Sequence, residues 1–414
     1  MTLHDNDHFS VEHAVQELPE LAEFSMLLGA VRRYLGMQVA FTSRFSGTER
    51  VVELVDKSAR ASWCDLKAGD ANPLGESYCF KIVGGQLPNV IADCQHHPVT
   101  GKMAVTEALS IGAYVGVPIV MGDGEIYGTL CCYDNQPQSD VSDRDIEFLS
   151  TIAAYIGKIL AKRCVQRHRI EMLTKQVQSV IDDKKIEVVF QPIFGKESNS
   201  YEYYEVLARF NTEPYRPPNE WINDADECGL GLEIESAIIN RVVERLALAN
   251  ASGIKLNTSI NVSPRMMESG LLPELLKHVN NQQVRIELTE HVRIKDYEQF
   301  RTHLEPLVRQ GFKICIDDVG AGFASLKHIL EIEPDVIKLD LSLAAQIHED
   351  PKRQALVTGL LAFARSFNCE VVAEGVETLE EYRALQNLGV TFFQGWYFSR
   401  PVAFESLPDT VSEH

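Results

Sequence analysis

The chain has 414 residues, of which 45% are hydrophobic and 24% are charged, so it is long enough for two or three domains with substantial cores. Its formal net charge of −20 argues against electrostatic binding of long nucleic acids or of an anionic membrane surface. That charge does not exclude a small phosphorylated ligand, because bound divalent cations invert the local field.

Cysteine usage and the first residues indicate the compartment. The nine cysteines show no paired spacing and several lie inside apolar runs, so we expect buried free thiols instead of disulfides. The first residues lack a basic segment followed by an apolar core, so no signal peptide is expected. The longest apolar stretches are shorter than a membrane span. We therefore predict a cytoplasmic protein that does not insert into a membrane.

Residues 12–142 are predicted to form a first domain that mixes helices and strands. Apolar residues recur at helical spacing over Ser10–Leu35, and a strand is expected over Ala40–Phe45. Two further strands, Gly112–Met121 and Ile126–Tyr133, flank the turn sequence Gly-Asp-Gly-Glu. These elements are typical of an antiparallel sheet backed by helices.

Residues 143–182 are predicted to form one long helix. Its apolar residues repeat every seven positions in two rows, which is typical of a coiled-coil seam with one polar layer. The alternative is an amphipathic helix that packs on its own domain. We favour a helix that joins two copies into a homodimer, because the register continues across the polar layer. The rows are Leu149, Ile156, Arg163, Ile170 and Val177, and Ile152, Ile159, Gln166, Leu173 and Val180.

Residues 183–406 are predicted to form a (β/α)₈ barrel of the TIM type. Short β-branched or aliphatic runs alternate with amphipathic helical stretches. A polar residue lies at the end of nearly every run, and such barrels build their active sites from polar residues at the ends of parallel strands. The runs are Glu187–Phe194, Tyr203–Leu207, Thr258–Val262, Val284–Leu288, Phe312–Ile316, Val336–Leu339, Glu370–Ala373 and Val390–Phe393.

Eight polar residues of this half are predicted to form one metal site. Carboxylates that meet at one barrel mouth would be forced to protonate unless a cation neutralised them. Hard oxygen ligands that include one amide suit Mg²⁺ or Mn²⁺ better than zinc. Two adjacent aspartates favour two metal ions, which activate water and stabilise the leaving oxygen in phosphodiester cleavage. The residues are Glu205, Asn261, Glu287, Asp317, Asp318, Lys338, Glu374 and Gln394.

Lys338 lies inside an apolar run, between Ile337 and Leu339. Burial of a lysine costs free energy unless its ammonium group is paired, so we expect this side chain among the acids. The alternative is a lysine whose head reaches solvent past its apolar neighbours. Asp340, two positions further on, favours the paired arrangement.

The eight site residues and their neighbours form motifs that resemble, in the same order along the chain, those of the EAL family of cyclic di-GMP phosphodiesterases. The resemblance spans roughly residues 183–403 and begins with Glu205-Val-Leu-Ala-Arg209. It implies a modified (β/α)₈ barrel, two Mg²⁺ or Mn²⁺ ions per active site and hydrolysis of cyclic di-GMP to linear pGpG. The other motifs are Asn261-Val-Ser263, Glu287-Leu-Thr-Glu290, Asp317-Asp-Val-Gly-Ala-Gly322, Lys338-Leu-Asp340, Glu374-Gly-Val-Glu377 and Gln394-Gly395.

The resemblance also implies three groups of site residues. The implied metal ligands are Glu205, Asn261, Glu287, Asp317 and Asp318. The implied catalytic residues are Lys338, Glu374, Gln394, Glu290 and Glu377. The implied substrate contacts are Gln191, Arg209 and Asp340.

Within these groups the resemblance implies individual roles. Asp317 would bridge the two ions, and Asp318 would bind the second one. Lys338 would hold or polarise the attacking water, whereas Glu374 and Gln394 would orient waters. No ligand position is lost, although valines replace the family's usual alanine after Glu205 and its usual phenylalanine after Asp318. That intact set favours an enzyme.

The first domain resembles a GAF domain through Glu76-Ser-Tyr-Cys79, Ile111–Pro118 and Tyr127–Tyr133. This implies a six-stranded antiparallel sheet with a cavity for an unknown small-molecule or redox signal. The cysteines and histidines of this domain offer a chromophore anchor or a metal site. Ordinary buried thiols and loop histidines are the interpretation that we favour.

We therefore predict a homodimeric cyclic di-GMP phosphodiesterase in which a GAF sensor acts through a coiled-coil helix on an EAL barrel. One alternative is a catalytically silent receptor that binds cyclic di-GMP and signals through partners. Another is a metal-dependent phosphodiesterase for a different nucleotide. Turnover with metal separates the enzyme from the receptor, and competition among substrates separates the two enzymes.

Overall fold

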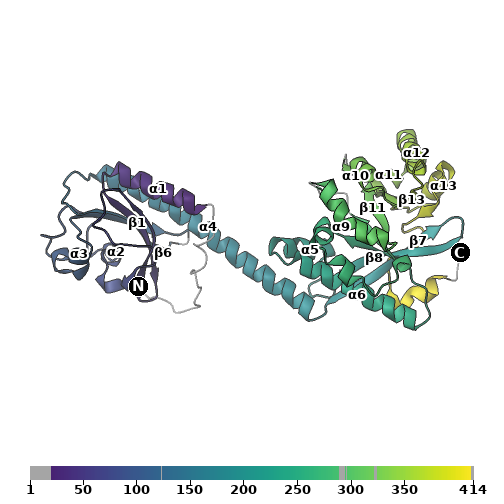
Figure 1. Ribbon diagram of the computed structural model, residues 1–414, viewed down its shortest axis with the longest axis horizontal. Helices are drawn as coiled ribbons and strands as arrows, with labels where there is room; N and C mark the ends of the chain where they lie inside the picture. The colour runs from purple at the N-terminus through teal and green to yellow at the C-terminus, as the bar shows by residue number, and fades with distance from the viewer. Residues whose placement is uncertain (1–19, 123, 289–293, 295, 321–323, 412–414) are drawn as a thin grey trace. The chain divides into compact units, whose positions relative to one another are not determined.

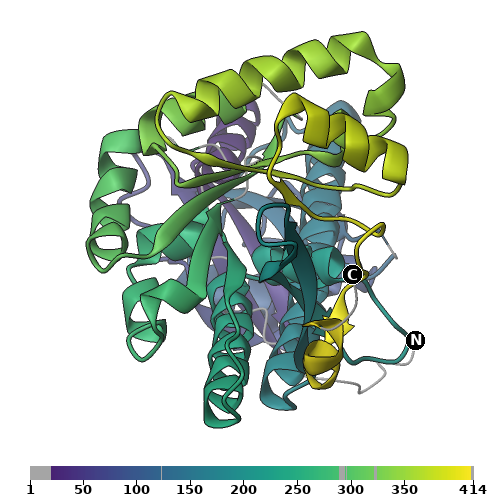
Figure 2. The ribbon, with the colours of Figure 1, turned by 90° about the vertical axis from the view of Figure 1, so that its right-hand side faces the viewer.

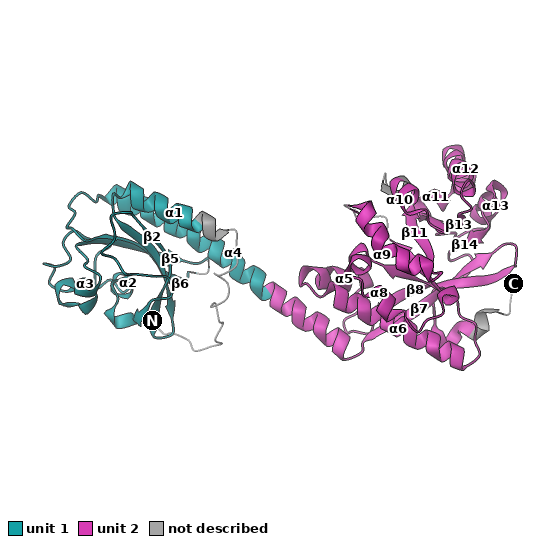
Figure 3. Ribbon diagram, viewed as in Figure 1, with its two compact units in different colours: residues 1–168 teal, residues 169–414 magenta. Residues whose placement is uncertain are grey.

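The computed structural model describes residues 20–122, 124–288, 294, 296–320 and 324–411. The chain divides into two compact units, residues 1–168 and 169–414 (Figure 3). The first part of the predicted helix over Ser10–Leu35 lies outside the described residues. All nine cysteines are free and most are buried, as predicted. Among the helices that the structure describes, none combines the length and apolar character that a membrane crossing needs.

The first unit is built on one antiparallel sheet with strand order β3-β2-β1-β6-β5-β4 (Figure 1). The predicted antiparallel sheet with helices is confirmed, as is the predicted hairpin, which is formed by β5 and β6. The strands are β1 (Val39–Ser46), β2 (Glu49–Lys57), β3 (Ala71–Pro73), β4 (Val90–Ile91), β5 (Ala113–Val120) and β6 (Ile126–Asp134). The helices are α1 (Glu20–Tyr34), α2 (Tyr78–Val83), α3 (Ala104–Ala108) and the first part of α4 (Asp143–Asp182).

Side chains of this sheet alternate between two cores on its opposite faces, as the pleat of a strand requires. Phe41 and Tyr114 belong to the core that α2 covers. Their neighbours Ala40 and Val115 belong to the core that α1 and α4 cover. Figure 1 shows α1 and the start of α4 beside each other over that second face.

Helix α4 confirms the predicted long helix. The rows of the predicted seam are covered at both ends by the chain itself. Leu149 and Ile156 lie in a core of the first unit, and Val177 and Val180 lie in a core of the second. An amphipathic helix that packs on its own domain, the alternative to a coiled coil, would be buried in this way. The pairing of α4 with a second copy stays a prediction.

The second unit is a closed barrel (Figure 2), which confirms the predicted TIM-type fold. Strands β8 to β14 run parallel to one another. Strand β7 is antiparallel to both β8 and β14 and closes the ring, and β15 adds to β7. The strands are β7 (Ile186–Gly195), β8 (Ser200–Phe210), β9 (Thr258–Val262), β10 (Val284–Leu288), β11 (Lys313–Val319), β12 (Val336–Leu339), β13 (Glu370–Ala373), β14 (Phe392–Phe393) and β15 (Val402–Ala403).

Helices surround the strands and bury their apolar faces against them. Ile260 on β9 and Phe300 on α9 share one large core, whereas Ile337 on β12 and Leu361 on α12 share another. These cores hold the parallel strands so that their carboxyl ends form one mouth. The helices are α5 (Pro218–Glu227), α6 (Gly231–Ala251), α7 (Pro264–Ser269), α8 (Leu272–Leu275), α9 (Tyr297–Arg309), α10 (Ala324–Ile332), α11 (Leu341–Ala344), α12 (Pro351–Arg365) and α13 (Leu379–Leu388).

Two arginines on α6 tie that helix to the first barrel strand. The Oε2 atom of Glu187 on β7 accepts hydrogen bonds from Arg241 Nη2 at 2.6 Å and from Arg245 Nη2 at 2.7 Å. Burial raises the pKa of Glu187, but the two guanidinium groups lower it by more, so that its pKa is about 2. Part of the stability of the barrel therefore depends on this carboxylate being ionised.

We expect Glu187→Gln to lower the free energy of unfolding by about 1–2 kcal/mol at about pH 7, because the ion pair is only partly shielded from solvent. The folded pKa lies below the unfolded value of about 4.3. The contribution is therefore complete above the unfolded value and is lost as the pH falls toward the folded one. Urea unfolding curves of the native protein and the variant should begin to converge below about pH 4.5.

The matched control is Glu244→Gln. Glu244 contacts Arg241 at 2.7 Å from an exposed position on the same helix, so its substitution should change stability by less than about 1 kcal/mol. A difference between native protein and Glu187→Gln that stays constant with pH would contradict the prediction.

Candidate active site

Parallel strands bring the predicted polar residues to the carboxyl end of the barrel. Glu205 lies on β8, Glu287 near the end of β10, and Lys338 near the end of β12. Because parallel strands end at the same edge, residues far apart in the sequence meet there. The others are Asn261 on β9, Asp317 and Asp318 on β11, Glu374 directly after β13 and Gln394 directly after β14. We call these eight residues the mouth cluster.

The ammonium group of Lys338 lies at the centre of the mouth cluster. Its Nζ atom is 3.0 Å from Glu205 Oε2, 2.5 Å from Glu374 Oε1 and 3.3 Å from Asp317 Oδ1. It also donates a hydrogen bond to Glu287 Oε1. Lys338 is fully buried, so carboxylates compensate its charge in place of water.

Two amide side chains hold the carboxylate of Glu205. Gln394 Nε2 donates to Glu205 Oε2 at 2.6 Å, and Asn261 Nδ2 donates to Glu205 Oε1 at 3.1 Å. Gln394 comes from the last strand of the ring and Glu205 from the second, so this bond joins the two ends of the barrel sequence. The predicted amide and acid positions are thus adjacent in space.

A break in strand register lets two adjacent aspartates share one site. Strands β11 and β12 are in register at Ile316 and again at Val319, with an irregularity between the two pairs. Asp318 adopts a left-handed backbone conformation with φ 56°. Neighbouring side chains of a regular strand point to opposite faces, and a bulge re-aims one of them. Carboxylate atoms of Asp317, Asp318 and Glu374 consequently lie within 4.8 Å of one another.

Burial and neighbouring charges set the protonation of the mouth cluster. Burial raises the pKa of Glu287 well above its ordinary value; Lys338 opposes this effect, and Glu205 reinforces it. Burial also raises the pKa of Glu374 to about 8. Burial acts in the same direction on Glu205, but Lys338 and Gln394 outweigh it and lower the pKa of that carboxyl. Without a further cation, the most buried acids would therefore tend to hold protons.

The donor atoms of the mouth cluster fit divalent cations. Four carboxylates surround one ammonium group, which leaves three excess negative charges when all four are ionised. Glu287 Oε2 and Gln394 Oε1 are buried and have no hydrogen-bond partner in the described part of the chain. Excess charge and hard oxygen donors suit Mg²⁺ or Mn²⁺. Two sets of carboxylates could hold a metal ion, Glu205, Glu287 and Glu374, and Asp317, Asp318 and Glu374.

The other predicted site residues do not belong to the mouth cluster. Gln191 faces Glu205 across the β7–β8 pairing. Asp340 follows β12 directly and caps α11, where Oδ1 accepts from Ser342 N at 2.9 Å. Glu377 is exposed, and no bond joins its side chain to the mouth cluster among the residues described. Glu290 lies outside the described residues.

Arg209 lines a cleft beside the mouth cluster. The cleft has a volume of about 580 Å³, and its walls come from β8, β9, α5 and α6. Asn261 and Arg265 also line it, and the Nη1 atom of Arg209 donates to the carbonyl oxygen of Ala208 at 2.8 Å. A ligand in this cleft would meet two guanidinium groups and the amide of Asn261, together with the carboxylates of Asp226 and Glu235.

Sequence reasoning missed a carboxylate that fixes the chain after Asn261. Glu235 on α6 accepts hydrogen bonds from Ser263 N and Ser263 Oγ, each at 2.6 Å. Burial raises the pKa of Glu235 above its ordinary value. The two partners are distant in the sequence and belong to different elements, so no local pattern announces the contact.

A second carboxylate that was missed fixes the loop after Glu374. Glu381 accepts from the backbone N–H groups of Glu377 at 2.9 Å and Thr378 at 3.0 Å. Thr378 Oγ1 accepts in turn from Glu381 N, which completes a capping box at the start of α13. A threonine followed three residues later by a glutamate is a visible sequence signal for that motif, so this residue could have been found.

Comparison with known proteins adds the family relationship. The family model of the EAL domain matches residues 174–401, and that of the GAF domain matches residues 20–160. Cyclic di-GMP phosphodiesterase PdeR of Escherichia coli (strain K12) is 32% identical over 213 residues, which are 49% of this chain and 32% of that protein. An uncharacterized signaling protein of Caulobacter vibrioides is 31% identical over 355 residues, 80% of this chain and 41% of that protein. This chain thus spans well under half the length of both relatives.

Solved structures with the same fold cover one or both units. PaMucR phosphodiesterase in its c-di-GMP complex has a TM-score of 0.52 and 23% identity, and the match covers 57% of this chain and 99% of that chain. The EAL enzyme Bd1971 in its cAMP and cyclic-di-GMP bound form has a TM-score of 0.55 and 20% identity, and the match covers 90% and 93%. At such identities the likeness shows the fold. Since the EAL match alone spans more than half of the 414 residues, the chain belongs to the EAL domain family.

Proposed function

We propose that this chain is a metal-dependent phosphodiesterase that hydrolyses cyclic di-GMP to linear pGpG. The observation that carries the proposal is the meeting of four carboxylates with Lys338 at the carboxyl end of a barrel. Membership of a family whose named members include cyclic di-GMP phosphodiesterases supports the choice of substrate.

The mouth cluster supplies the donors for two divalent cations, Mg²⁺ or Mn²⁺. Such ions would lower the pKa of a water and stabilise the charge that develops on the phosphodiester. The proposed ligands of the first site are Glu205, Asn261, Glu287 and Asp317. Asp317 would be shared with the second site, where Asp318 would join it, and the register break in β11 supports that sharing.

The other residues of the cluster are proposed to act on water and substrate. The positive charge of Lys338 Nζ would favour the deprotonated form of an attacking water. Glu374 and Gln394 would orient waters, and Gln394 Oε1 is a buried acceptor without a partner among the described side chains. Arg209 would bind a phosphate through its planar guanidinium group.

The predicted site residues outside the mouth cluster are proposed to contact the substrate or to support the metal ligands. Gln191 and Asp340 would contact the substrate from positions beside Glu205 and directly after β12. Glu290 and Glu377 would support the metal ligands and their loops.

We also propose that residues 12–142 act as a sensor for a small-molecule or redox signal. Residues 143–182 would connect this sensor to a phosphodiesterase domain over residues 183–406, and the chain would work as a homodimer. The family matches over residues 20–160 and 174–401 support this division. The cytoplasmic location stays a prediction.

The direct test is incubation of the purified protein with cyclic di-GMP and Mg²⁺ or Mn²⁺, followed by chromatography of the nucleotides. We expect pGpG from the native protein and a rate about a thousandfold lower from Glu205→Ala, because several kcal/mol of transition-state stabilisation would be lost with the metal ligand. The matched control is Glu202→Ala, since Glu202 is exposed on the same strand and its loss should leave the rate unchanged.

Three results would count against the proposal. Tight binding of cyclic di-GMP without product in either metal would make the chain a receptor. Equal cleavage of cyclic di-AMP in a competition experiment would overturn the substrate assignment. Full activity of Glu205→Ala would remove the mouth cluster from the mechanism.

A further inference from the structure

Two buried cysteines of the first unit are in direct contact. Cys79 lies on α2 and Cys131 on β6, and their Sγ atoms are 3.8 Å apart. The two residues are 2% and 0% exposed and belong to the same core. Because the sulfur atoms of a disulfide are about 2.0 Å apart, these two need to approach by less than about 2 Å to form one.

The surroundings of the two sulfurs make them chemically unequal. A hydrogen bond from Cys131 lowers the pKa of Cys79 below its ordinary value, against the effect of burial, and the charge of Arg50 lowers it further. Burial raises the pKa of Cys131 well above its ordinary value. Cys79 therefore favours the thiolate form and Cys131 keeps its proton. A thiolate beside a second thiol is the arrangement of cysteines that oxidants convert into disulfides.

Arg50 supplies a permanent positive charge beside Cys79. Its side chain is only 3% exposed and lines the same small cavity as Cys79. Its Nη2 atom donates to the neutral amide of Asn72 at 2.7 Å, and its guanidinium group lies 5.8 Å from the centre of the Phe41 ring. Among the residues described, no carboxylate pairs with it. Since a guanidinium group keeps its proton, a thiolate at Cys79 would balance this buried charge.

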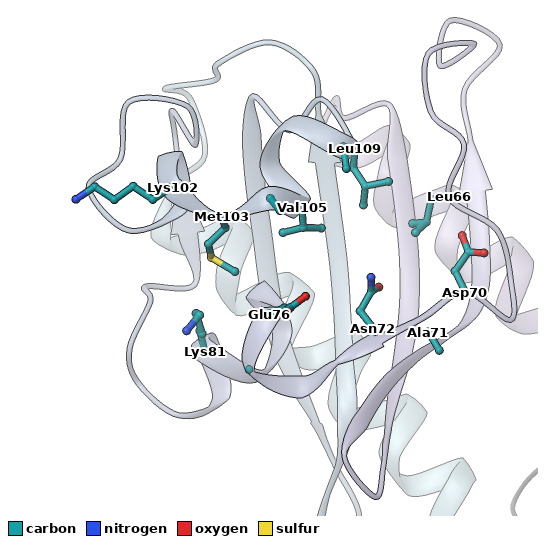
Figure 4. A pocket seen from close by; sticks show the side chains of 13 residues that line it. Leu66, Asp70, Ala71, Asn72, Glu76, Lys81, Lys102, Met103, Val105 and Leu109 are labelled. Atoms are coloured by element: carbon teal, nitrogen blue, oxygen red, sulfur yellow. The ribbon is translucent and has the colours of Figure 1, made fainter.

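Helix α2, which contains Cys79, is a short element at the surface of the first unit. It has six residues and is followed by Gly84 and Gly85, and its residue Phe80 is 38% exposed. Lys81 of the same helix lines an open cleft of about 660 Å³ (Figure 4). Short surface elements open locally at a lower free energy than a central sheet does. Local opening of α2 would therefore expose Cys79 to small solutes while β6 stays in place.

We propose that Cys79 and Cys131 form a reversible disulfide in the presence of hydrogen peroxide, with Cys79 as the residue that reacts first. The proposal rests on the sensor role proposed for the first unit, for which it names the oxidant and the two residues. Its test measures thiols and disulfides, so that its failure would leave the proposed cleavage of cyclic di-GMP untouched.

The reaction proceeds in two steps. The Cys79 thiolate attacks one oxygen of the peroxide, the O–O bond breaks, and hydroxide leaves, so that Cys79 becomes a sulfenic acid. The Cys131 sulfur then attacks the sulfur of Cys79, the S–S bond forms, the S–O bond breaks, and the proton of Cys131 leaves with the oxygen as water. The hydroxide takes up the proton that Cys79 had released. Two thiols thus lose two electrons and two protons, and one peroxide becomes two waters.

The test treats the reduced, folded full chain with hydrogen peroxide, blocks the remaining thiols with N-ethylmaleimide in urea, and maps disulfides by mass spectrometry without reductant. A Cys164→Ser background removes a cysteine that is exposed and would react on its own. We expect a peptide pair linked through Cys79 and Cys131, and the loss of two free thiols per chain. Dithiothreitol should restore both thiols.

Three single substitutions separate the roles of the two cysteines. In Cys131→Ser, Cys79 should stop at the sulfenic acid, which dimedone traps when it is added as the chain is unfolded. In Cys79→Ser, Cys131 should stay reduced, because its thiol keeps its proton. The matched control is Cys132→Ser, because Cys132 is adjacent on β6 but belongs to the core on the opposite face of the sheet. That variant should form the disulfide at the native rate.

The role of Arg50 is tested by the rate of the first step. Arg50→Gln should slow the oxidation of Cys79 at about pH 7 by at least about tenfold, since the fraction of thiolate falls. A rise to about pH 9 should restore much of that rate, because it exceeds the ordinary thiol pKa of about 8.5. A purely structural effect of the substitution would not be reversed by pH. The matched control is Arg44→Gln, whose arginine is paired with Glu53 at 3.2 Å and whose loss should leave the rate unchanged.

Four results would overturn the proposal. The folded protein could keep both thiols under peroxide, or could form the Cys79–Cys131 link only in urea. Links to Cys132 that are as frequent as links to Cys131 would indicate oxidation of an unfolded chain. Equal rates in the native protein and Arg50→Gln would show that Cys79 does not react as a thiolate held by that charge.

Discussion

Replacing Lys338 with methionine is expected to lower the free energy of unfolding of the metal-free second unit by about 3–5 kcal/mol. The side chain is fully buried, and its Nζ atom contacts four carboxylates. Without it, Glu205, Glu287 and their neighbours would face one another with no cation between them. Partial protonation of the most buried acids keeps the cost at this level, because it removes some of the repulsion.

Urea unfolding followed by tryptophan fluorescence measures this change. Trp63 belongs to the first unit, so a Trp63→Phe background leaves Trp221 and Trp396 as reporters of the second. The matched control is Lys313→Met, because the Nζ atom of Lys313 pairs with Glu370 at 3.1 Å from a partly exposed position, and its loss should cost at most about 1 kcal/mol. Equal effects of the two substitutions would show that Lys338 does not compensate the acids.

Replacing Glu287 with glutamine is expected to abolish the stabilisation of the protein by Mg²⁺ or Mn²⁺. A metal ion at about 100 times its Kd stabilises the folded state by about 2.7 kcal/mol. Glu287 is fully buried in the mouth cluster and its Oε2 atom has no partner among the residues described, so a bound cation would supply the partner that this carboxylate lacks. Glutamine keeps the shape and removes the charge.

The measurement is the Tm of the second unit across a metal titration. The matched control is Glu370→Gln, which makes the same substitution at the opposite, amino end of the parallel strands, where Glu370 begins β13. That variant should keep the full metal response. A metal response that survives in Glu287→Gln would contradict the proposed ligand set while leaving the Lys338 prediction intact.

The barrel could be predicted from the sequence because its buried strands leave a strong local pattern. Strands β9, β10, β12 and β13 begin and end at the predicted residues. The prediction for the last strand was two residues too long at its start, and β11 extends through both aspartates. A run of apolar residues shows which segment is buried, but hydrogen bonds with neighbouring strands determine where a strand ends.

The residues of the candidate site could be predicted because the strands that carry them end at the same mouth of the barrel. The sequence indicates that Glu205, Lys338 and Gln394 share one mouth, since each lies at a strand end of one barrel. It does not indicate that Glu235 holds Ser263. That fact depends on a contact between distant segments, and such a contact leaves no periodicity.

The heptad rows show that sequence periodicity does not identify the partner of a buried helix face. A repeat of apolar residues reports which face of a helix is buried but not what buries it. The face that includes Leu149 and Val177 is covered by the chain's own cores. A homodimer therefore has to be measured, and sequence periodicity alone does not establish it.

The antiparallel first strand sets the order in which the barrel can be completed. Strand β7 at residues 186–195 closes the ring only by pairing with β14 at residues 392–393. Gln394, which follows directly, then reaches Glu205. During synthesis a growing chain would expose the open edge of β7 for some 200 residues, and contacts of such long range form slowly. The mouth cluster would thus remain incomplete until β14 pairs with β7. A nascent or interrupted chain that lacks β14 would have an open sheet edge and an incomplete site.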